Sequence, residues 1–349
     1  MANGRNRKRV FCEFAFLKKF RSANGHLSPF DSADAFKNWI AVSEYIQKTH
    51  LLLDVDKATF YNNIRTGDAI FKLIKRSTEG YFKVDYTDTH GIKDVDFYIW
   101  RPEGIASSYL LTKKSAVCQH YRKSYGVNVL TPDCWTDNRT ARDNAFYFRD
   151  CGSTVDKEER ISWREIFRGE YQLCNCNTMI IIDNYIEKDM ERNLFAILDS
   201  LLPESLYQID FHLTILTERA DGRTKESYKE EYRKISDHIK KIRPKLKCHL
   251  ELYVPEGKSN FHDRTIITNN VMINCGAGFN LLNNSGKARN NTKVEITYPY
   301  LQGYSDTCDL MYEKTINDVR TEIDKIDDSI RYGAHWPEER LSINRLIRM

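Results

Sequence analysis

Residues 178–183, with the sequence TMIIID, contain the apolar run Met179–Ile182, which is typical of a buried β-strand. Residues 190–202 then place leucine and isoleucine side chains on one helical face, and residues 209–217 (IDFHLTILT) repeat the pattern of a buried strand. A charged amphipathic helix over 225–242 and a third strand over 247–254 follow. The order strand, helix, strand, helix, strand predicts a parallel sheet with right-handed crossovers.

Paired strands are predicted after this sheet. Segments 263–268 and 271–275 flank Asn269 and Asn270, a dipeptide suited to the positive φ angles of a tight hairpin turn. One more strand is predicted over 293–298, and a helix over 308–330. Because antiparallel strands join a parallel set, we expect a mixed sheet flanked by helices.

The first half of the chain alternates less regularly. Expected strands cover 9–14, 50–54, 97–100, 107–112 and 127–130, and expected helices cover 34–49 and 114–125. The length of 349 residues exceeds the roughly 100–200 residues of a typical domain. We therefore predict the α/β class, with one α/β domain over residues 1–165 and a second over residues 170–349.

Composition excludes several classes of protein. Apolar residues make up 41% and charged residues 29%, which argues against disorder, and no run approaches the roughly 20 apolar residues of a membrane span. The basic first ten residues lack the apolar run of a signal peptide, and nine unevenly spaced cysteines are typical of reduced thiols, so a cytoplasmic protein is expected. The net charge of +4 permits a nucleic-acid or anionic-membrane partner without requiring one.

The chemistry is predicted to lie in residues 261–280, with the sequence FHDRTIITNNVMINCGAGFN. On a strand, His262 and Arg264 project from the same face. A neutral imidazole can attack phosphorus, and a neighbouring guanidinium can hold the oxygens that gain charge. Gly276 and Gly278 would let the backbone approach a phosphate.

Other polar residues near this segment complete the predicted site. Asn280, Ser285 and Lys287 are expected to contribute hydrogen bonds or positive charge to phosphate binding. Asp183 ends the first strand of the sheet, where ligands of open parallel sheets bind, so it is expected to face the cleft or to orient His262. Capping of the following helix is the alternative role for this aspartate.

The same segment resembles the half-site of the phospholipase D superfamily, whose signature is His-x-Lys, four residues, Asp, six residues and then a glycine-rich turn with Ser and Asn. His262 fills the His position, Arg264 the Lys position, Asn269 the Asp position and Gly276 the first Gly, while Asn280 lies one residue past the usual Asn. The variant is most similar to bacterial phospholipase D-like proteins and to the C-terminal domain of microtubule-interacting-and-trafficking proteins. The resemblance covers residues 178–300.

This resemblance implies a metal-independent phosphodiesterase with His262 as nucleophile or acid, acting on nucleic acid. The chain holds a single copy of the motif, so a complete site implies a homodimer. A bacterial antiviral defence effector, with the first domain supplying regulation or recognition, would suit this layout, and a regulatory protein is a candidate partner. Arg264 in place of Lys and Asn269 in place of Asp favour the alternative, a non-catalytic module that binds a phosphate-bearing partner or a membrane surface.

A second alternative places the chemistry in the first half. Acidic residues follow or precede the predicted strands there, and hard cations such as Mg²⁺ take oxygen ligands; the residues are Glu13, Asp54, Asp56, Asp94 and Asp96. Residues 110–132 faintly resemble the last conserved region of PIN-like nucleases, although Lys113 and Lys114 stand where that family has acids. Outside this alternative, no cofactor or metal is expected.

A basic cluster ends the charged helix. It comprises Lys240, Lys241, Arg243, Lys245 and Lys247. Such a cluster suits a nucleic-acid backbone or an anionic headgroup. Cations at a helix C-terminus also stabilise the helix dipole, which is the alternative explanation.

Overall fold

The structure is a computed structural model, and it describes residues 9–23, 33–86, 108–112, 115–132, 151–167, 176–186, 189–219, 221–255, 264–297, 299, 306–326, 330–333, 342 and 344–348. The chain divides into two compact units. The first comprises Met1–Arg122, Val127–Arg149 and Tyr300–Asp309, and the second comprises Lys123–Gly126, Asp150–Pro299 and Leu310–Met349.

The first unit is built on a five-stranded parallel sheet with the strand order β3-β2-β1-β4-β5. Its strands are β1 (Arg9–Cys12), β2 (His50–Leu53), β3 (Lys83–Tyr86), β4 (Ser108–Leu110) and β5 (Asn128–Leu130). The strand order reverses between β1 and β4. Right-handed crossovers therefore place the helices before and after this reversal on opposite faces of the sheet.

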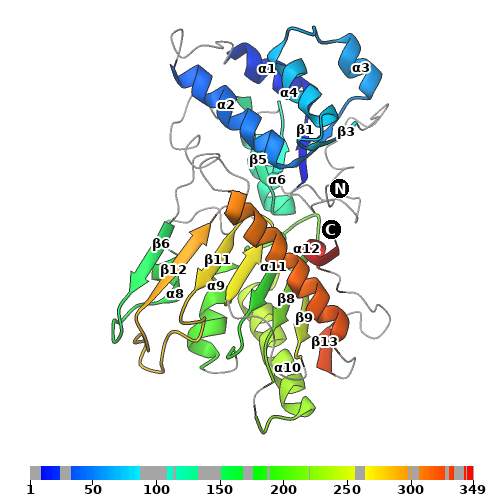
Figure 1. The fold of residues 1–349 in the computed structure, drawn as a ribbon. Helices are drawn as coiled ribbons and strands as arrows, with labels where there is room; N and C mark the ends of the chain where they lie inside the picture. The colour runs from blue at the N-terminus through cyan, green and yellow to red at the C-terminus, as the bar shows by residue number, and fades with distance from the viewer. Residues whose placement is uncertain are drawn as a thin grey trace. The chain divides into compact units, whose positions relative to one another are not determined.

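Helices of the first unit bury apolar residues that lie along one face of each helix. They are α1 (Phe14–Ala23), α2 (Ala33–Lys48), α3 (Lys57–Asn62), α4 (Ala69–Thr78) and α6 (Ser115–Tyr125). Helices α1, α2 and α4 contact one another, and Figure 1 shows them together on one side of the unit. Helix α4 begins at the cap Asp68, whose carboxylate accepts the Ile70 N–H at 2.7 Å, and it buries Ile70, Leu73 and Ile74.

The second unit is built on an eight-stranded mixed sheet with the order β13-β9-β8-β7-β10-β11-β12-β6. The parallel strands are β7 (Thr178–Ile182), β8 (Phe211–Leu216) and β9 (Cys248–Tyr253). The antiparallel strands are β6 (Cys151–Val155), β10 (Thr265–Thr268), β11 (Met272–Cys275), β12 (Thr292–Thr297) and β13 (Arg331–Gly333). Strand β7 is buried along its whole length, which agrees with its apolar run Met179–Ile182.

Helices flank this sheet. They are α8 (Trp163–Ile166), the π-helical turn η2 (Glu191–Phe195), α9 (Ala196–Leu201), α10 (Lys225–Ile242), α11 (Asp306–Lys325) and α12 (Arg345–Arg348). Figure 1 shows α11 in front of the sheet and α9 and α10 behind it. Thr224 caps α10 by accepting the Ser227 N–H. Tyr312 on α11 donates from its hydroxyl to the carbonyl of Thr268 at 2.7 Å.

The predicted α/β class is confirmed: the chain has one parallel and one mixed sheet, both flanked by helices. The second unit begins earlier than the domain boundary predicted between residues 165 and 170, because β6 pairs with β12. This pairing joins segments far apart in the sequence, which local periodicity does not report. Among the helices that the structure describes, none is long and apolar enough to cross a membrane.

Candidate functional site

An open pocket of about 640 Å³ lies at the end of β7. Its lining includes five residues that the sequence analysis singled out, namely Asp183, Arg264, Gly276, Gly278 and Asn280. It also includes residues that the sequence analysis did not select, namely Tyr185, Ala277, Arg289, Asn290, Asn291, Thr292 and Lys293. Cations and amides dominate this lining, which suits a polar, negatively charged ligand.

Strand register brings these residues together. Thr265 pairs with Ile182 on one side and with Asn274 on the other, so Arg264 lies beside the end of β7 and beside the glycine-rich turn. Cys275 in turn pairs with Val294, which places Thr292 and Lys293 at the same edge. The ends of four strands, β7, β10, β11 and β12, therefore meet at one edge of the sheet.

Arg264 is held by its surroundings. Its side chain runs over Gly278, where an added Cβ would lie 2.5 Å from the arginine Cδ, and Gly278 has a φ of +86°. Its Nη1 donates to the carbonyl of Gly276 at 3.3 Å, and the guanidinium carbon lies 5.4 Å from the centre of the Tyr185 ring. Its Nε is buried and finds no hydrogen-bond acceptor among the described residues. The guanidinium is thus fixed in place with donor capacity left over.

Asp183 closes the floor of the pocket. Its side chain is fully buried, and it accepts the N–H of Tyr185 at 2.7 Å and the N–H of Phe279 at 2.5 Å. Burial raises the pKa of Asp183, while these two hydrogen bonds and the nearby Arg264 charge lower it. The carboxylate therefore fixes the glycine-rich turn to the end of β7.

Gly276 and Gly278 have different roles from the one predicted. The N–H groups of the turn are largely used inside it: Ala277 donates to Thr292, Gly278 to Cys275 and Phe279 to Asp183. Gly278 provides space for Arg264, and a Cβ on Gly276 would meet only the Thr292 hydroxyl oxygen, at 3.6 Å. The turn thus positions a cation more than it presents backbone donors.

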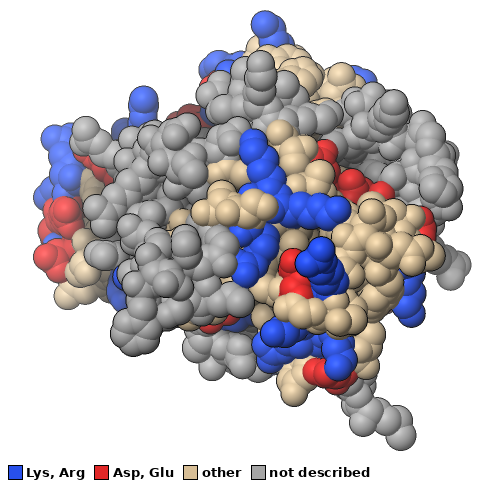
Figure 2. Space-filling model, turned by 90° about the horizontal axis from the view of Figure 1, so that it is seen from above, with Lys and Arg blue, Asp and Glu red and all other residues tan. Residues whose placement is uncertain are grey.

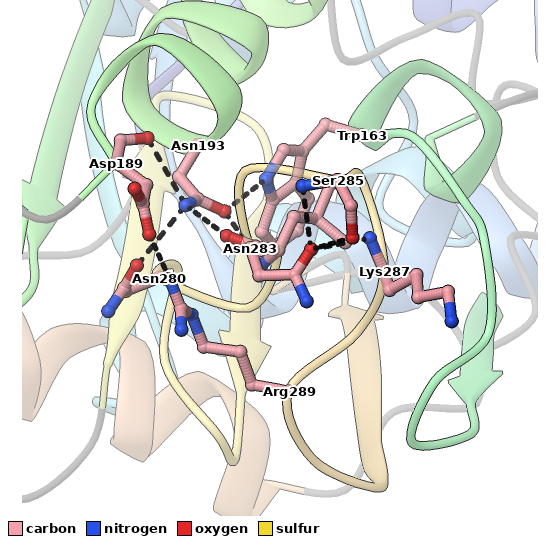
Figure 3. A network of polar contacts seen from close by, with 9 residues as sticks. Trp163, Asp189, Asn193, Asn280, Asn283, Ser285, Lys287 and Arg289 are labelled. Carbon is pink, nitrogen blue, oxygen red and sulfur yellow. Dashed lines mark hydrogen bonds and ion pairs between the residues drawn. The ribbon is translucent and has the colours of Figure 1, made fainter.

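Asn280 is oriented by the buried Asn193 of the π-helical turn η2 (Figure 3). The Nδ2 of Asn193 donates to Asn280 Oδ1 at 3.2 Å and to the carbonyl of Leu282 at 2.9 Å. Its Oδ1 accepts the Leu282 N–H at 2.9 Å and the indole N–H of Trp163 at 3.3 Å. Since the Asn280 oxygen is engaged, its NH₂ group is the part left to donate into the pocket.

The other cations of the pocket form ion pairs. Arg289 pairs with Asp189, and Lys293 Nζ lies 2.5 Å from the carboxylate of Glu295. Arg264 has no carboxylate within salt-bridge distance among the described residues. It is therefore the cation best placed to receive an anionic ligand.

Three of the predicted site residues are absent from the described lining of the pocket, for different reasons. His262 falls outside the described residues. Ser285 donates from both N–H and hydroxyl to Asn283, and Lys287 pairs with Glu158 at 3.2 Å. Figure 3 shows the Lys287 side chain pointing away from Asn280. Neither Ser285 nor Lys287 lines the pocket, because the loop that carries them turns outward.

Asn269 fills the Asp position of the phospholipase D signature, but it lies at the far end of the hairpin. It is buried, accepts the N–H of Asn177 at 3.1 Å and donates to the carbonyl of Gly126 at 3.1 Å. Five residues of extended chain separate it from Arg264, which is roughly 16 Å at about 3.3 Å per residue. Asn269 therefore stabilises the hairpin turn and does not contribute to the pocket.

The basic cluster at the end of α10 is separated from the pocket by the fold. Lys245 and Lys247 precede β9, and since β7, β8 and β9 are parallel, they lie at the sheet edge opposite Asp183. Arg243 donates to the carbonyls of Leu202 and Asp199 at 3.2 and 2.7 Å, so it anchors the end of α9. Lys240 lies 4.0 Å from Asp237, and Lys241 lines a second pocket beside α10.

The acids of the first unit are engaged locally. Glu13 accepts the N–H and hydroxyl of Thr112 at 2.7 and 2.6 Å, and Asp54 accepts the Phe14 N–H at 2.7 Å. Burial raises the pKa of Asp54, and the neighbouring Glu13 adds to the increase. Asp56 caps α3. Asp94 and Asp96 lie outside the described residues, and within the described part of the chain no group of His, Cys, Asp and Glu is arranged to hold a metal.

Sequence reasoning missed the far wall of the pocket. Residues 289–293 (RNNTK) form a polar run directly before the strand predicted over 293–298. Pairing of that strand with 271–275 would have placed the run beside Gly276. The Arg289 partner, Asp189, gives no signal in the sequence, since it comes from a different loop.

Comparisons with known proteins give a distant structural likeness. No protein-family model matches the chain. No curated protein matches it either. Among solved structures, phosphatidylserine synthase from Haemophilus influenzae Rd KW20 is similar at 9% identity with a TM-score of 0.30, over 95% of this chain and 83% of that chain.

Proposed function

We propose that the second unit is a phospholipase D-like phosphodiesterase that binds a phosphodiester of nucleic acid in the pocket and cleaves it without a metal. The observation that carries the proposal is Arg264, whose side chain lines the pocket beside Tyr185 and Gly278 and forms no salt bridge among the described residues. A preorganised cation costs little reorganisation when a phosphate binds. The Asn280 amide supplies a second donor.

His262 is the proposed nucleophile, because it lies two residues before Arg264 and shares its face if the strand extends that far. One imidazole nitrogen would attack phosphorus, and the bond from phosphorus to the leaving oxygen would break. A second imidazole would donate a proton to that oxygen. Water would then hydrolyse the phosphohistidine and regenerate His262.

The second imidazole is proposed to be the partner's His262. The sequence has one copy of the motif, and a two-fold interface can bring two copies together. Static light scattering tests this directly: a dimer at assay concentration is expected, and a monomer that still cleaves would disprove a composite site.

Cleavage is tested with bis(p-nitrophenyl) phosphate and a labelled oligonucleotide, each with and without EDTA. Wild type is expected to cleave in EDTA, His262→Ala to be inactive, and Arg264→Ala to lose about 100-fold or more in kcat/KM. Activity that requires a metal and ignores His262 would overturn the proposal.

A second candidate function is binding without cleavage. It is favoured by Asn269, which stands where the signature has an acid and which is committed to backbone hydrogen bonds. Under this function, neither substrate is cleaved, while Arg264→Ala weakens binding of a phosphate ester. Binding that is unaffected by Arg264→Ala would exclude this function too.

A further inference from the structure

The first unit carries a strongly basic surface, which we define by Lys18 on α1 and Lys72, Lys75 and Arg76 on α4. All four side chains are exposed, and α1 packs against α4. Figure 2 views the molecule from above and shows Lys and Arg side chains gathered near the middle, with some Asp and Glu side chains beside them. The four cations are therefore exposed side chains of two helices that pack against each other.

Acidic neighbours do not neutralise this surface. Within the described part of the chain, none of the four cations forms a salt bridge. Asp68 caps α4, Asp54 accepts a backbone N–H, and Asp85 lies 2.7 Å from His50. The exposed Glu79 at the C-cap of α4 is the acid nearest in sequence to Lys75 and Arg76, so three basic residues of α4 stand against one acid. The positive potential is thus left facing solvent.

The arrangement on α4 is costly for the helix itself. Lys72 lies three residues before Lys75 and four before Arg76, so like charges are neighbours on the helix surface. Each such pair destabilises a helix by about 0.2–0.5 kcal/mol. Lys75 and Arg76 gain something from the helix dipole in the last turn, but Lys72 does not. A polyanionic partner would remove this repulsion.

We propose that this basic surface binds the phosphate backbone of nucleic acid, independently of the pocket in the second unit. Phosphates spaced along a strand match cations spread over two packed helices, and their binding releases counterions. An exposed aromatic side chain adjoins the surface: Tyr81 is 57% exposed, with the Arg76 guanidinium 4.8 Å from its ring centre. Such a ring can stack on a base.

An anionic membrane fits this surface less well. Membrane-surface helices bury apolar side chains among the acyl chains. The apolar residues of α4, namely Ile70, Leu73 and Ile74, face the core instead. Among the described residues of this unit, Tyr81 has the exposed large hydrophobic side chain, and its hydroxyl makes that side chain amphipathic.

The test compares two triple variants of the full chain in a His262→Ala background, so that the probes stay intact. Lys72→Gln, Lys75→Gln and Arg76→Gln remove the basic surface on α4. Lys229→Gln, Arg233→Gln and Lys234→Gln remove the same charge from α10, where each lysine has a carboxylate within 4.0 Å on its own helix and Arg233 is exposed near Glu230. Fluorescence anisotropy of labelled oligo(U)20 and of a 20-base-pair DNA duplex is measured from 50 to 300 mM NaCl.

The α4 variant is expected to bind about ten-fold or more weakly at 100 mM salt. Its plot of log K against log salt should be shallower by about two to three, since each phosphate contact contributes roughly 0.7–0.9 to the slope. The α10 variant should retain the parent slope. Equal losses in both variants, no loss in either, or no binding by the parent would overturn the proposal. The proposal would also be overturned if the protein bound phosphatidylserine vesicles through the α4 lysines but bound neither oligo(U)20 nor the DNA duplex.

Discussion

Gly278 lies beneath the aliphatic part of Arg264, with a φ of +86°. A side chain at this position would meet two penalties, because the left-handed backbone disfavours a Cβ and the Arg264 Cδ already fills the space. Glycine here gives Arg264 its place in the pocket. The residue type was predictable from the motif, but its role was not.

Gly278→Ala is therefore expected to destabilise the second unit by about 1–2 kcal/mol from the backbone alone. It should also displace Arg264 and reduce kcat/KM for bis(p-nitrophenyl) phosphate by at least about ten-fold. Gly276→Ala is the matched control, since its Cβ would be in ordinary contact at 3.6 Å. Equal effects of the two substitutions would show that Arg264 does not depend on Gly278.

Asp183 has a pH signature that follows from its burial. Burial raises its pKa above the ordinary value of 3.8, so the unfolded chain loses this proton first as pH rises. The stability that the protonated form contributes is complete below pH 3.8 and is lost as pH rises through the raised pKa.

Asp183→Asn lacks this titration. The unfolding free energy of wild type minus that of Asp183→Asn is therefore expected to fall as pH rises from about 4 toward neutrality. Urea unfolding followed by fluorescence across this range measures the difference. A difference that grows with pH would mean that hydrogen bonds and Arg264, and not burial, dominate the carboxylate.

At the scale of elements, the π-helical turn η2 has a clear consequence. It directs Asn193 inward, where one side chain satisfies polar groups from α8 and from the loop after the glycine-rich turn (Figure 3). Single π-turns inside helices occur often at functional sites. Here the turn links the helix layer to the pocket through Asn280.

Asn193→Ala should destabilise the unit by about 2–4 kcal/mol, because the buried Trp163 indole N–H and Leu282 N–H lose their acceptor. Asn193→Asp keeps the acceptor but sets an anion against the Leu282 carbonyl and Asn280 Oδ1. Asn193→Asp should lower kcat/KM for the diester by more than its loss of folding stability explains. The exposed Asn284→Ala is the control. The unfolding midpoint and kcat/KM are measured for each variant. If Asn193→Ala matched Asn284→Ala in both, Asn193 would not have this role.

Most elements were predictable because their periodicity is local. Strands β7, β8 and β9, the β10–β11 hairpin and α10 lie where apolar runs, alternation and a polar turn placed them. Helices α1 and α4 were missed in a half whose pattern is irregular. The π-turn was missed too, since its apolar spacing is nearly that of an α-helix.

The pocket was only partly predictable for a related reason. Arg264, Gly276, Gly278 and Asn280 belong to one short segment, so a motif could find them. Arg289 and Tyr185 join them through strand pairing and loop return. Such long-range contacts leave no periodic trace in a single sequence.

At the scale of the whole molecule, the end of the chain completes the core of the second unit. Asn344 is fully buried and donates to the Met179 carbonyl at 3.0 Å and to the Thr214 hydroxyl at 3.0 Å. Ser342 donates to the buried Glu251 carboxylate at 2.5 Å. Leu346 is buried as well. The last residues therefore hydrogen-bond buried polar groups of β7, β8 and β9.

Removal of residues 342–349 is expected to destabilise the second unit by more than about 4 kcal/mol. The buried side chains of Leu346 and Ile347 contribute roughly 1.5–3 kcal/mol each. The Glu251 carboxylate also loses the hydrogen bond that Ser342 donates. Because whole domains are stable by only about 5–15 kcal/mol, the truncated chain should lose the cooperative transition of this unit in calorimetry. Asn344→Asp is a milder variant for comparison. It keeps the oxygen that accepts the Thr178 hydroxyl but loses the hydrogen bonds to the Met179 carbonyl and the Thr214 hydroxyl. Its unfolding midpoint should therefore fall between those of the truncated and wild-type chains. If the truncated chain unfolded at the wild-type midpoint temperature, the last segment would not contribute to the stability of the second unit.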